Sequence, residues 1–206
     1  MPTLQEQFGQ IDIYLFDQLL KGRIAPGMTI VDAGCGSGRN IAYLLREGYD
    51  VFGCDVDARE VERVRQLARK LAPSLAAANI SSNFRVEPVQ KMSFADGCAD
   101  VVICNTVLHF AKDDAEFTAM LDELWRVLKP GGLLFARLGS TIGMESQVEH
   151  VQGRRYKSPD GSERYLVDDA VLAAHTARLS AELADPVKTT VVQNLRAMTT
   201  WVLRKK

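Results

Sequence analysis

The fold is decided by Val31-Asp32-Ala33-Gly34-Cys35-Gly36-Ser37-Gly38, an apolar segment carrying one acid that runs into three glycines at alternate positions. Residues 29–33 are typical of a buried strand. Glycines have no Cβ atom, so they allow the backbone to turn sharply and a ligand to approach it closely. In an open α/β sheet, ligands lie beyond the carboxyl ends of the strands. The stretch therefore predicts a ligand site at the end of the first strand.

Strands and helices are predicted to alternate along the chain. Apolar segments typical of strands span residues 29–33, 49–54, 84–89, 99–105 and 133–138. Apolar residues recur at helical spacing over residues 8–20, 39–47, 58–71 and 114–128. Two further strands are predicted over residues 187–192 and 198–203, close enough in sequence to form an antiparallel hairpin. We therefore expect the α/β class, a Rossmann-like open twisted sheet that is mostly parallel, with about seven strands and an antiparallel C-terminal hairpin at the edge.

Composition limits the classes of partner. The chain has 25 Lys and Arg against 26 Asp and Glu, a formal net charge of -1, which supplies no large cationic field for a nucleic-acid backbone. No apolar run is long enough for a membrane span, and the polar residues 1–9 do not resemble a signal peptide. We expect a cytoplasmic protein, without nucleic-acid or membrane partners. The four cysteines and three histidines are widely scattered, so neither a disulfide framework nor a metal site is predicted.

The glycine loop departs from the dinucleotide-binding pattern G-x-G-x-x-G/A. That pattern requires a small residue at position 39, where this chain has Arg39, and a bulky side chain would prevent close approach of a pyrophosphate. A Tyr-x-x-x-Lys pair near the site is also missing. An NAD-dependent oxidoreductase of the Rossmann type therefore remains an alternative that the residues disfavour. Cys35, within the loop, is interpreted as a small filler and not as a nucleophile.

With Asp32 two residues before it, the G-x-G-x-G loop resembles the first motif of the class I S-adenosylmethionine-dependent methyltransferases. Phe94 is similar to the last residue of the family's L-P-F segment, and Ala99-Asp100-Val101-Val102 is similar to its fourth strand. Leu128-Lys129-Pro130-Gly131-Gly132 is similar to the turn before its fifth strand. The resemblance extends over residues 30–138. It is greatest to the small tellurite-resistance-type bacterial methyltransferases, whose loop and C-terminal residues are similar to those of this chain.

The resemblance implies that S-adenosylmethionine is the cofactor and S-adenosylhomocysteine the product. In the family, the acid that matches Asp32 organises the loop and the methionine amino group, and the acid that matches Asp55 binds both ribose hydroxyls. A carboxylate accepts two hydroxyl donors, so the residue type suits this role. Asp57 is a rival that could instead cap the next helix. Asp55 is favoured because it directly ends the second strand.

Adenine recognition departs from the family pattern. Relatives often have an Asp at the position of Pro88, which offers neither a carboxylate nor an N–H group. The backbone of Val89 and the side chain of Gln90, or the neighbouring Glu87, are the candidates for this contact. The expected cofactor contacts are Asp32, Gly34, Cys35, Gly36, Gly38, Asp55, Val56, Val89, Gln90 and Asn105.

The acceptor side of the site is expected near the ends of the fourth and fifth strands. By residue type, His109 is the best candidate for a general base, and a histidine bonded to the backbone is the alternative. Arg137 either meets an anionic substrate or pairs with a surface acid. The remaining expected substrate contacts are Tyr14, Arg154 and Tyr156.

The resemblance implies one methyltransferase domain over residues 1–206. Its expected parts are an N-terminal helical lid (1–27), a cofactor-binding core (28–141), a variable substrate-side segment with a helix (142–183) and a C-terminal hairpin (184–206). The expected reaction is methyl transfer to a small molecule by in-line displacement, in a monomer or homodimer. A non-catalytic S-adenosylmethionine-binding protein is a further alternative. Asn105 is not followed by the Pro-Pro-aromatic element of amino-nitrogen nucleic-acid methyltransferases, which disfavours a flipped base as acceptor.

Overall fold

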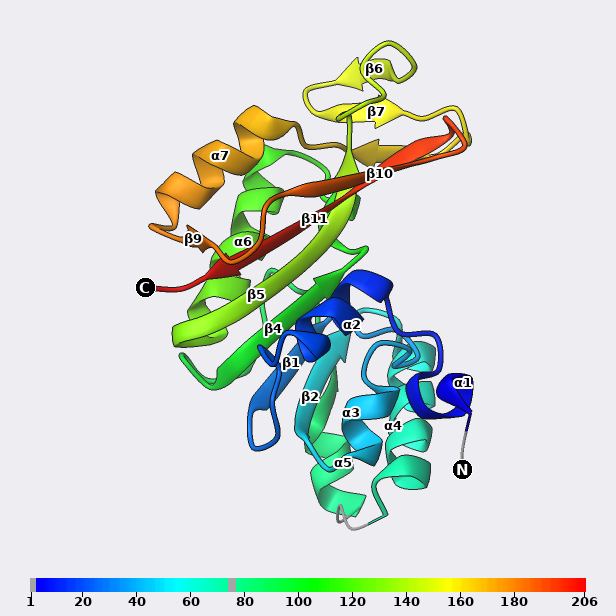
Figure 1. Cartoon of the computed structure of the whole chain (residues 1–206), viewed down its shortest axis with the longest axis vertical. Helices are drawn as coiled ribbons and strands as arrows, with labels where there is room; N and C mark the ends of the chain where they lie inside the picture. Colours follow the sequence, from blue (N-terminus) through cyan, green and yellow to red (C-terminus); the bar gives the residue numbers. More distant parts are fainter. Residues whose placement is uncertain (1–2, 74–76) are drawn as a thin grey trace.

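A computed structural model describes residues 3–73 and 77–206 of the chain, and a central sheet runs diagonally through the molecule (Figure 1). The strand order is β10-β11-β5-β4-β1-β2-β3, and β9 pairs with β11. The strands are β1 (Thr29–Ala33), β2 (Asp50–Asp55), β3 (Phe84–Val86), β4 (Ala99–Asn105), β5 (Leu128–Ser140), β9 (Glu182–Leu183), β10 (Lys188–Val192) and β11 (Arg196–Arg204). The first five are parallel, whereas β10 and β11 are antiparallel to their neighbours. The predicted Rossmann-like sheet with an antiparallel C-terminal hairpin is confirmed.

Helices cover both faces of this sheet (Figure 1). They are α1 (Leu4–Phe8), α2 (Ile13–Leu20), α3 (Ala42–Arg46), α4 (Ala58–Leu71), α5 (Ala77–Asn83), the 3-10 helix η1 (Leu108–Phe110), α6 (Asp114–Val127) and α7 (Asp169–Arg178). No helix in the described residues has both the length and the apolar character needed to cross a membrane.

The core forms two apolar clusters, one on each face of the sheet. Val31 of β1 packs in one cluster with α6 and α7, and its neighbour Ile30 packs in the other cluster with α2, α3 and α4. Successive side chains of a strand point to opposite faces, so a strand that is buried on both faces must be apolar throughout. This requirement explains the continuous apolar run of β4. The strand order reverses between β1 and β4, which opens a crevice at their carboxyl ends.

Three predicted elements need correction. The helix expected over residues 8–20 is two helices, because Gly9 ends α1 with φ 62° and Asp12 caps α2 by accepting from the Tyr14 N–H. The helix expected over 39–47 begins only at α3, since the chain turns as far as Ile41. The strand expected over 84–89 stops at β3, two residues before Pro88, which has no N–H to donate to a ladder.

Residues 142–163, the first part of the expected variable segment, contain strands of a second sheet. This three-stranded antiparallel sheet consists of β6 (Glu149–Gln152), β7 (Arg155–Lys157) and β8 (Glu163–Tyr165), and it lies at the top of Figure 1. Its strands are short and mostly solvent-facing, so they lack the apolar alternation that identifies a strand. The segment Pro159-Asp160-Gly161, a sequence typical of turns, joins β7 to β8, with Gly161 at φ 82°.

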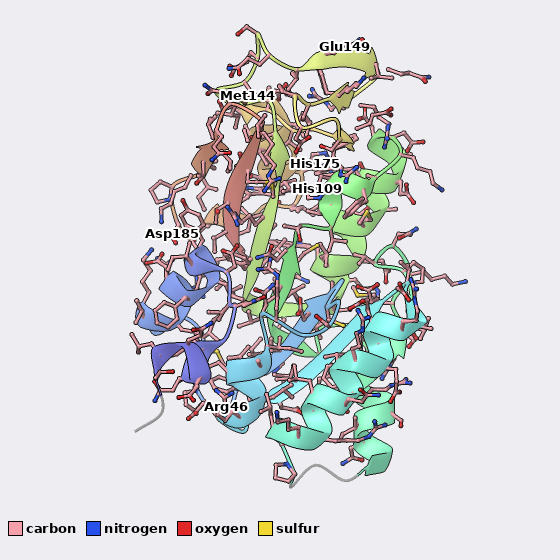
Figure 2. All side chains as sticks on the ribbon, turned by 90° about the vertical axis from the view of Figure 1, so that its right-hand side faces the viewer. Arg46, His109, Met144, Glu149, His175 and Asp185 are labelled. Atoms are coloured by element: carbon pink, nitrogen blue, oxygen red, sulfur yellow. The ribbon has the colours of Figure 1, made fainter. Side chains whose placement is uncertain are left out.

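The N-terminal segment is bonded to the chain between β9 and β10, next to the C-terminal hairpin. Of the lid expected over residues 1–27, residues 1–2 lie outside the described part of the chain. Asp185, which follows β9, accepts from Gln18 at 2.8 Å and forms an ion pair with Lys21 at 3.0 Å. Figure 2 shows Asp185 beside the N-terminal helices. These contacts hold α2 across the sheet and next to the C-terminal hairpin.

Candidate functional site

The three glycines of the loop after β1 are required for different reasons. All three have a positive φ, namely 81° at Gly34, 50° at Gly36 and 87° at Gly38. A Cβ atom on Gly34 would lie 2.2 Å from a methyl group of Val107, and one on Gly38 would lie 2.7 Å from Val64 of α4. A Cβ atom on Gly36 would meet nothing within 4 Å. Packing therefore explains the first and third glycines, while Gly36 borders open space.

Hydrogen bonds from the end of β2 hold the loop. The N–H groups of Gly34 and Cys35 both donate to the carbonyl oxygen of Cys54, at 2.8 and 2.9 Å. The N–H of Gly36 donates to Oδ2 of Asp55 at 2.9 Å, and Oδ1 of Asp55 accepts from the N–H of Asp57 at 3.0 Å. Asp55 thus fixes the glycine loop through Oδ2, while its Oδ1 bonds the backbone at the start of α4. Burial raises the pKa of the Cys35 thiol, which makes it a poor nucleophile.

The rival Asp57 serves a different purpose. Its side chain caps α4 by accepting from the N–H of Arg59, and the Arg59 guanidinium pairs with it at 2.9 Å. These bonds lower the pKa of Asp57 to about 2. Asp57 does not line the cavity that opens beside Asp55. The structure therefore separates the two acids, with Asp55 at the site and Asp57 at the helix cap.

A cavity of ≈ 270 Å³ opens beside the loop, and we call it the loop cavity. The sequence-predicted residues in its wall are Gly34, Asp55, Val56, Val89 and Gln90. Glu87, the third candidate for adenine recognition, also lines it, although its carboxylate already accepts from the N–H and hydroxyl of Ser93. Val56 is 71% exposed and presents an apolar surface there.

The opposite wall of the loop cavity comes from segments that the sequence analysis missed. Val107 and Phe110 follow β4, and Glu116 and Met120 belong to α6. The Phe110 ring is 57% exposed, and Gln90 donates to Glu116 across the cavity at 3.1 Å. The N–H of Glu116 donates to Asp113, the N-cap of α6, and the other carboxylate oxygen of Glu116 accepts from the N–H of Lys112. Nothing in the sequence indicated that the side chain of Glu116 would line this cavity.

Two buried polar atoms at the switch point have no protein partner among the described residues. They are Oδ2 of Asp32, on β1, and Nδ2 of Asn105, on the neighbouring β4. Asp32 is only 1% exposed. Burial raises its pKa to about 7, Arg39 opposes that shift and Asp55 adds to it. An orphaned carboxylate oxygen and an orphaned amide N–H₂ group suit a ligand that carries both an ammonium group and an acceptor oxygen.

A second cavity, of ≈ 350 Å³, lies beyond the ends of β4 and β5. We call it the arginine cavity, because Arg39, Arg137, Arg164 and Arg196 all line it. His109 also lines it, and Figure 2 shows His109 in the upper half of the molecule, below the strand that carries Glu149. Of these residues, the sequence analysis predicted only His109 and Arg137 as site residues.

The two cavities share a wall formed by residues 106–110. Thr106 and His109 face the arginine cavity, whereas Val107 and Phe110 face the loop cavity. Thr106 has φ 64°, which is rare for a β-branched residue, and two hydrogen bonds maintain it. Its N–H donates to the carbonyl of Arg137 at 2.7 Å and its hydroxyl donates to the carbonyl of Asn105 at 2.6 Å. Strained residues of this kind cluster at ligand sites.

His109 is buried and its Nδ1 accepts a hydrogen bond from the N–H of Gly139 at 3.1 Å. Burial lowers the pKa of His109 to about 4, assisted by the positive charges of Arg164 and Arg196. The ring is therefore neutral at pH 7, and its proton resides on Nε2, the tautomer that we assign from this bond. A general base needs a free lone pair, which Nε2–H does not have. The geometry favours the backbone-bonded alternative and makes Nε2 a donor.

Residues of the N-terminal segment hold Arg137 near the carboxyl end of β5. Its guanidinium pairs with Asp12 at 2.6 Å and lies 5.3 Å from the centre of the Tyr14 ring. Its Nε is buried and has no partner in the described part of the chain. The Tyr14 hydroxyl forms a hydrogen bond with the Thr190 hydroxyl at 2.6 Å, which holds the ring beside Arg137. Tyr14 does not line the arginine cavity.

The structure does not bring Arg154 and Tyr156 to these cavities. Arg154 pairs with Asp168, the cap of α7, at 3.0 Å. The Tyr156 ring packs edge-on against His150 with the ring centres 5.3 Å apart. The turn between β7 and β8 instead contributes Ser158, Asp160 and Ser162. Arg154 and Tyr156 belong to the same segment as this turn, but the sequence does not show which side chains of the segment face the cavity, because that depends on strand register.

Comparisons with known proteins agree with this architecture. Residues 31–136 match the family model described as a methyltransferase domain. The chain is 33% identical over 112 residues to 2-methyl-6-phytyl-1,4-hydroquinone methyltransferase of Synechocystis sp., covering 54% of this chain and 32% of that protein. It is 30% identical over 164 residues to malonyl-[acyl-carrier protein] O-methyltransferase of Herminiimonas arsenicoxydans, covering 74% and 56%. The chain thus spans a third to little more than half of the length of these relatives.

Solved structures show the same fold. The magnesium protoporphyrin IX methyltransferase of Synechocystis, determined with bound S-adenosylmethionine, superposes with a TM-score of 0.68 at 17% identity, covering 97% of this chain and 79% of that one. A Burkholderia thailandensis 1,6-didemethyltoxoflavin-N1-methyltransferase, determined with its substrate and S-adenosylhomocysteine, gives 0.67 at 19% identity, covering 92% and 74%. The family match over residues 31–136, on a sheet of this order, shows that the chain belongs to the methyltransferase domain family.

Proposed function

We propose that this protein is an S-adenosylmethionine-dependent methyltransferase that acts on a small molecule. The observation that carries the proposal is the pair of cavities on either side of residues 106–110. The loop cavity lies beside the glycine loop, where the cofactor would bind. The arginine cavity adjoins it at the ends of β4 and β5, where an acceptor would bind.

In the loop cavity, the ribose and the adenine of S-adenosylmethionine would each meet complementary residues. Asp55 lines the loop cavity, and each of its carboxylate oxygens retains a lone pair for a ribose hydroxyl. The exposed apolar faces of Val56 and Phe110 would enclose the adenine ring. The acid that is missing at Pro88 is replaced, we infer, by Glu116 together with Gln90. Both side chains offer acceptor oxygens for the adenine amino group.

The methionine end would lie along the glycine loop. The open space at Gly36 provides access, and the neighbouring backbone of Gly34, Cys35 and Gly38 gives the loop its shape. The ammonium group would supply the partner that buried Asp32 lacks, and the amide of Asn105 would donate to the carboxylate. Satisfying such buried groups is worth about 1–3 kcal/mol each.

When bound, S-adenosylmethionine supplies a methyl carbon that its sulfonium already activates, so the chain need not provide a covalent catalyst. The task of the residues around the arginine cavity is to hold the acceptor in line and to exclude water. His109 would donate from Nε2 to the acceptor, and Arg137 would orient it. A histidine that cannot take a proton suits an acceptor that arrives deprotonated.

Three observations support a small-molecule acceptor. The volume of the arginine cavity, ≈ 350 Å³, lies in the range of small-molecule sites, about 300–1,000 Å³. The turn between β7 and β8 forms part of its wall, so the cavity is bounded by more than the central sheet. Ribosomal RNA and tRNA methyltransferases are also among the relatives of this chain, but a net charge of -1 disfavours a nucleic-acid partner.

The four free cysteines are consistent with the cytoplasmic location that we propose.

Calorimetry with S-adenosylmethionine, S-adenosylhomocysteine and NAD tests the cofactor class. We expect the first two to bind and NAD to show no heat of binding. A panel of metabolites incubated with a methyl-labelled donor then tests for transfer. Tight binding of NAD alone would overturn the proposal. Cofactor binding without label transfer to any acceptor in the panel would favour the non-catalytic alternative.

A further inference from the structure

We propose that the arginine cavity selects an acceptor that carries an anionic group, a carboxylate or a phosphate. The inference rests on the proposed function, because it specifies the substrate class of the same site. Arg39, Arg137, Arg164 and Arg196 line the cavity, and Asp160 is the single acidic residue among the described residues of its lining. A neutral or cationic acceptor would not require four guanidinium groups around a cavity of ≈ 350 Å³.

Two of the four guanidinium groups have no carboxylate partner among the described residues. Arg39 donates only to the carbonyl of Gln10 and the amide oxygen of Asn105. Arg164 donates to the backbone carbonyl of Glu163 and lies 4.8 Å from the centre of the Phe110 ring. Neither forms an ion pair in the described part of the chain, although Arg39 also acts at longer range on Asp32, so both guanidinium groups can bind an anion.

The other two groups are only partly compensated. Arg196 is 3.6 Å from Asp160, which is long for an ion pair, and Asp160 already accepts from the N–H and hydroxyl of Ser162. Arg137 pairs with Asp12 at 2.6 Å, but its buried Nε has no partner in the part of the chain that the structure describes. A buried N–H without an acceptor costs free energy, which a bound anion would recover.

His109 adds a neutral donor to the wall, whereas the hydroxyls of Thr106 and Ser162 already donate to Asn105 and Asp160. His109 presents Nε2–H, and its low pKa reflects burial together with the charges of Arg164 and Arg196. Four guanidinium groups against one carboxylate in the described lining give the cavity a positive potential. Guanidinium forks match carboxylate and phosphate oxygens in bidentate geometry. The same potential would repel an amine substrate in its ammonium form.

The proposal is tested by comparing an anion with a neutral molecule of the same shape. Benzoate, benzamide and phenyl phosphate are titrated into the protein, with and without saturating S-adenosylhomocysteine, by calorimetry or by chemical-shift perturbation. We expect both anions to bind at least tenfold more tightly than benzamide. The benzoate and phenyl phosphate arms distinguish a carboxylate from a phosphate preference.

Arg164→Gln and Arg196→Gln should each reduce the preference for the anion several-fold, because each removes one charge and keeps a polar side chain. Arg178→Gln is the matched control, since Arg178 pairs with Asp122 on the surface at 2.6 Å and lies outside the cavity. It should leave the preference unchanged. Thermal unfolding of each variant verifies that it is folded, and having two cavity variants keeps the test valid if one of them is not.

Benzamide binding as tightly as benzoate would overturn the anion proposal, as would an equal loss of preference in Arg178→Gln. The outcome is separate from that of the proposed function. Binding of S-adenosylhomocysteine without any anion preference would refute only the acceptor class. An anion preference in a protein that does not bind S-adenosylhomocysteine would refute only the methyltransferase assignment.

Discussion

The loop cavity and the arginine cavity lie on either side of one wall, yet they are built in different ways. Most of the residues that were predicted for the loop cavity come directly after β1, β2 and β3 in the sequence. The carboxyl ends of these strands meet because the strands are parallel neighbours. The arginine cavity combines Arg39, His109, Arg137, Arg164 and Arg196, which lie far apart in sequence. The first depends on the sheet, whereas the second also depends on how β6–β8 and the C-terminal hairpin pack against it.

The largest expected effect is in the loop cavity, at Gly36. We expect Gly36→Val to weaken binding of S-adenosylhomocysteine more than about 100-fold, because the side chain would occupy the open space and is strained at φ 50°. Gly97→Val is the matched control, with φ 57° and equally open surroundings away from both cavities. Calorimetry on the two variants separates obstruction of the ligand from backbone strain. Equal weakening in both would show that Gly36 does not face the ligand.

Asp32 is expected to make the loop side of the site sensitive to pH. Its folded-state pKa of about 7 lies above the ordinary value of 3.8, so the folded protein retains a proton that the unfolded chain releases. The free energy of unfolding should therefore fall as pH rises from about 4 to about 7, and stay level above that. In Asp32→Asn this fall should be absent.

Denaturant titrations of wild type and Asp32→Asn at pH 5, 6, 7 and 8 measure the effect. Relative to wild type, the variant should gain stability with pH by up to a few kcal/mol. A difference that is constant with pH would mean that Asp32 is ionised throughout.

Asp55→Ala should weaken binding of S-adenosylhomocysteine by about 1.5–3 kcal/mol, roughly 10- to 150-fold, because hydrogen bonds to a charged group are lost. The bond from Gly36 to Asp55 is lost as well, so part of the effect is a looser loop. Asp57→Ala removes the cap of α4 and should leave the affinity unchanged. The reverse result in calorimetry would transfer the ribose contact to Asp57.

The smallest expected effect is at His109 in the arginine cavity. A lost general base lowers turnover about 10²–10⁴-fold. Since Nε2 of His109 is a donor, His109→Gln should lower turnover less than about tenfold and leave cofactor affinity unchanged. The pH–rate profile of wild type should show no histidine ionisation near 6.5, because burial lowers the pKa of His109 from this ordinary value to about 4. A hundredfold loss in turnover would restore the general-base hypothesis.

The same difference explains what the sequence could and could not predict. Asp32, Gly36 and Asp55 could be placed because apolar patterning locates the strand ends and parallel pairing brings those ends together. Arg164 and Arg196 could not, because β8 lies in a solvent-facing sheet without apolar alternation and Arg196 begins a hairpin strand.

The tautomer of His109 was also beyond sequence analysis. It depends on the single N–H group of Gly139 in β5, 30 residues along the chain from His109 in η1. The sequence supported both a base and a backbone-bonded residue, and only the direction of that hydrogen bond distinguishes them.

The central claim is that the two cavities are the cofactor and acceptor halves of one site. A crystal structure of the protein with S-adenosylhomocysteine tests it most directly. We expect the adenosine in the loop cavity, the ribose hydroxyls on Asp55, and the sulfur directed past Val107 towards the arginine cavity. A sulfur directed away from the arginine cavity, or a ligand bound elsewhere, would contradict the claim.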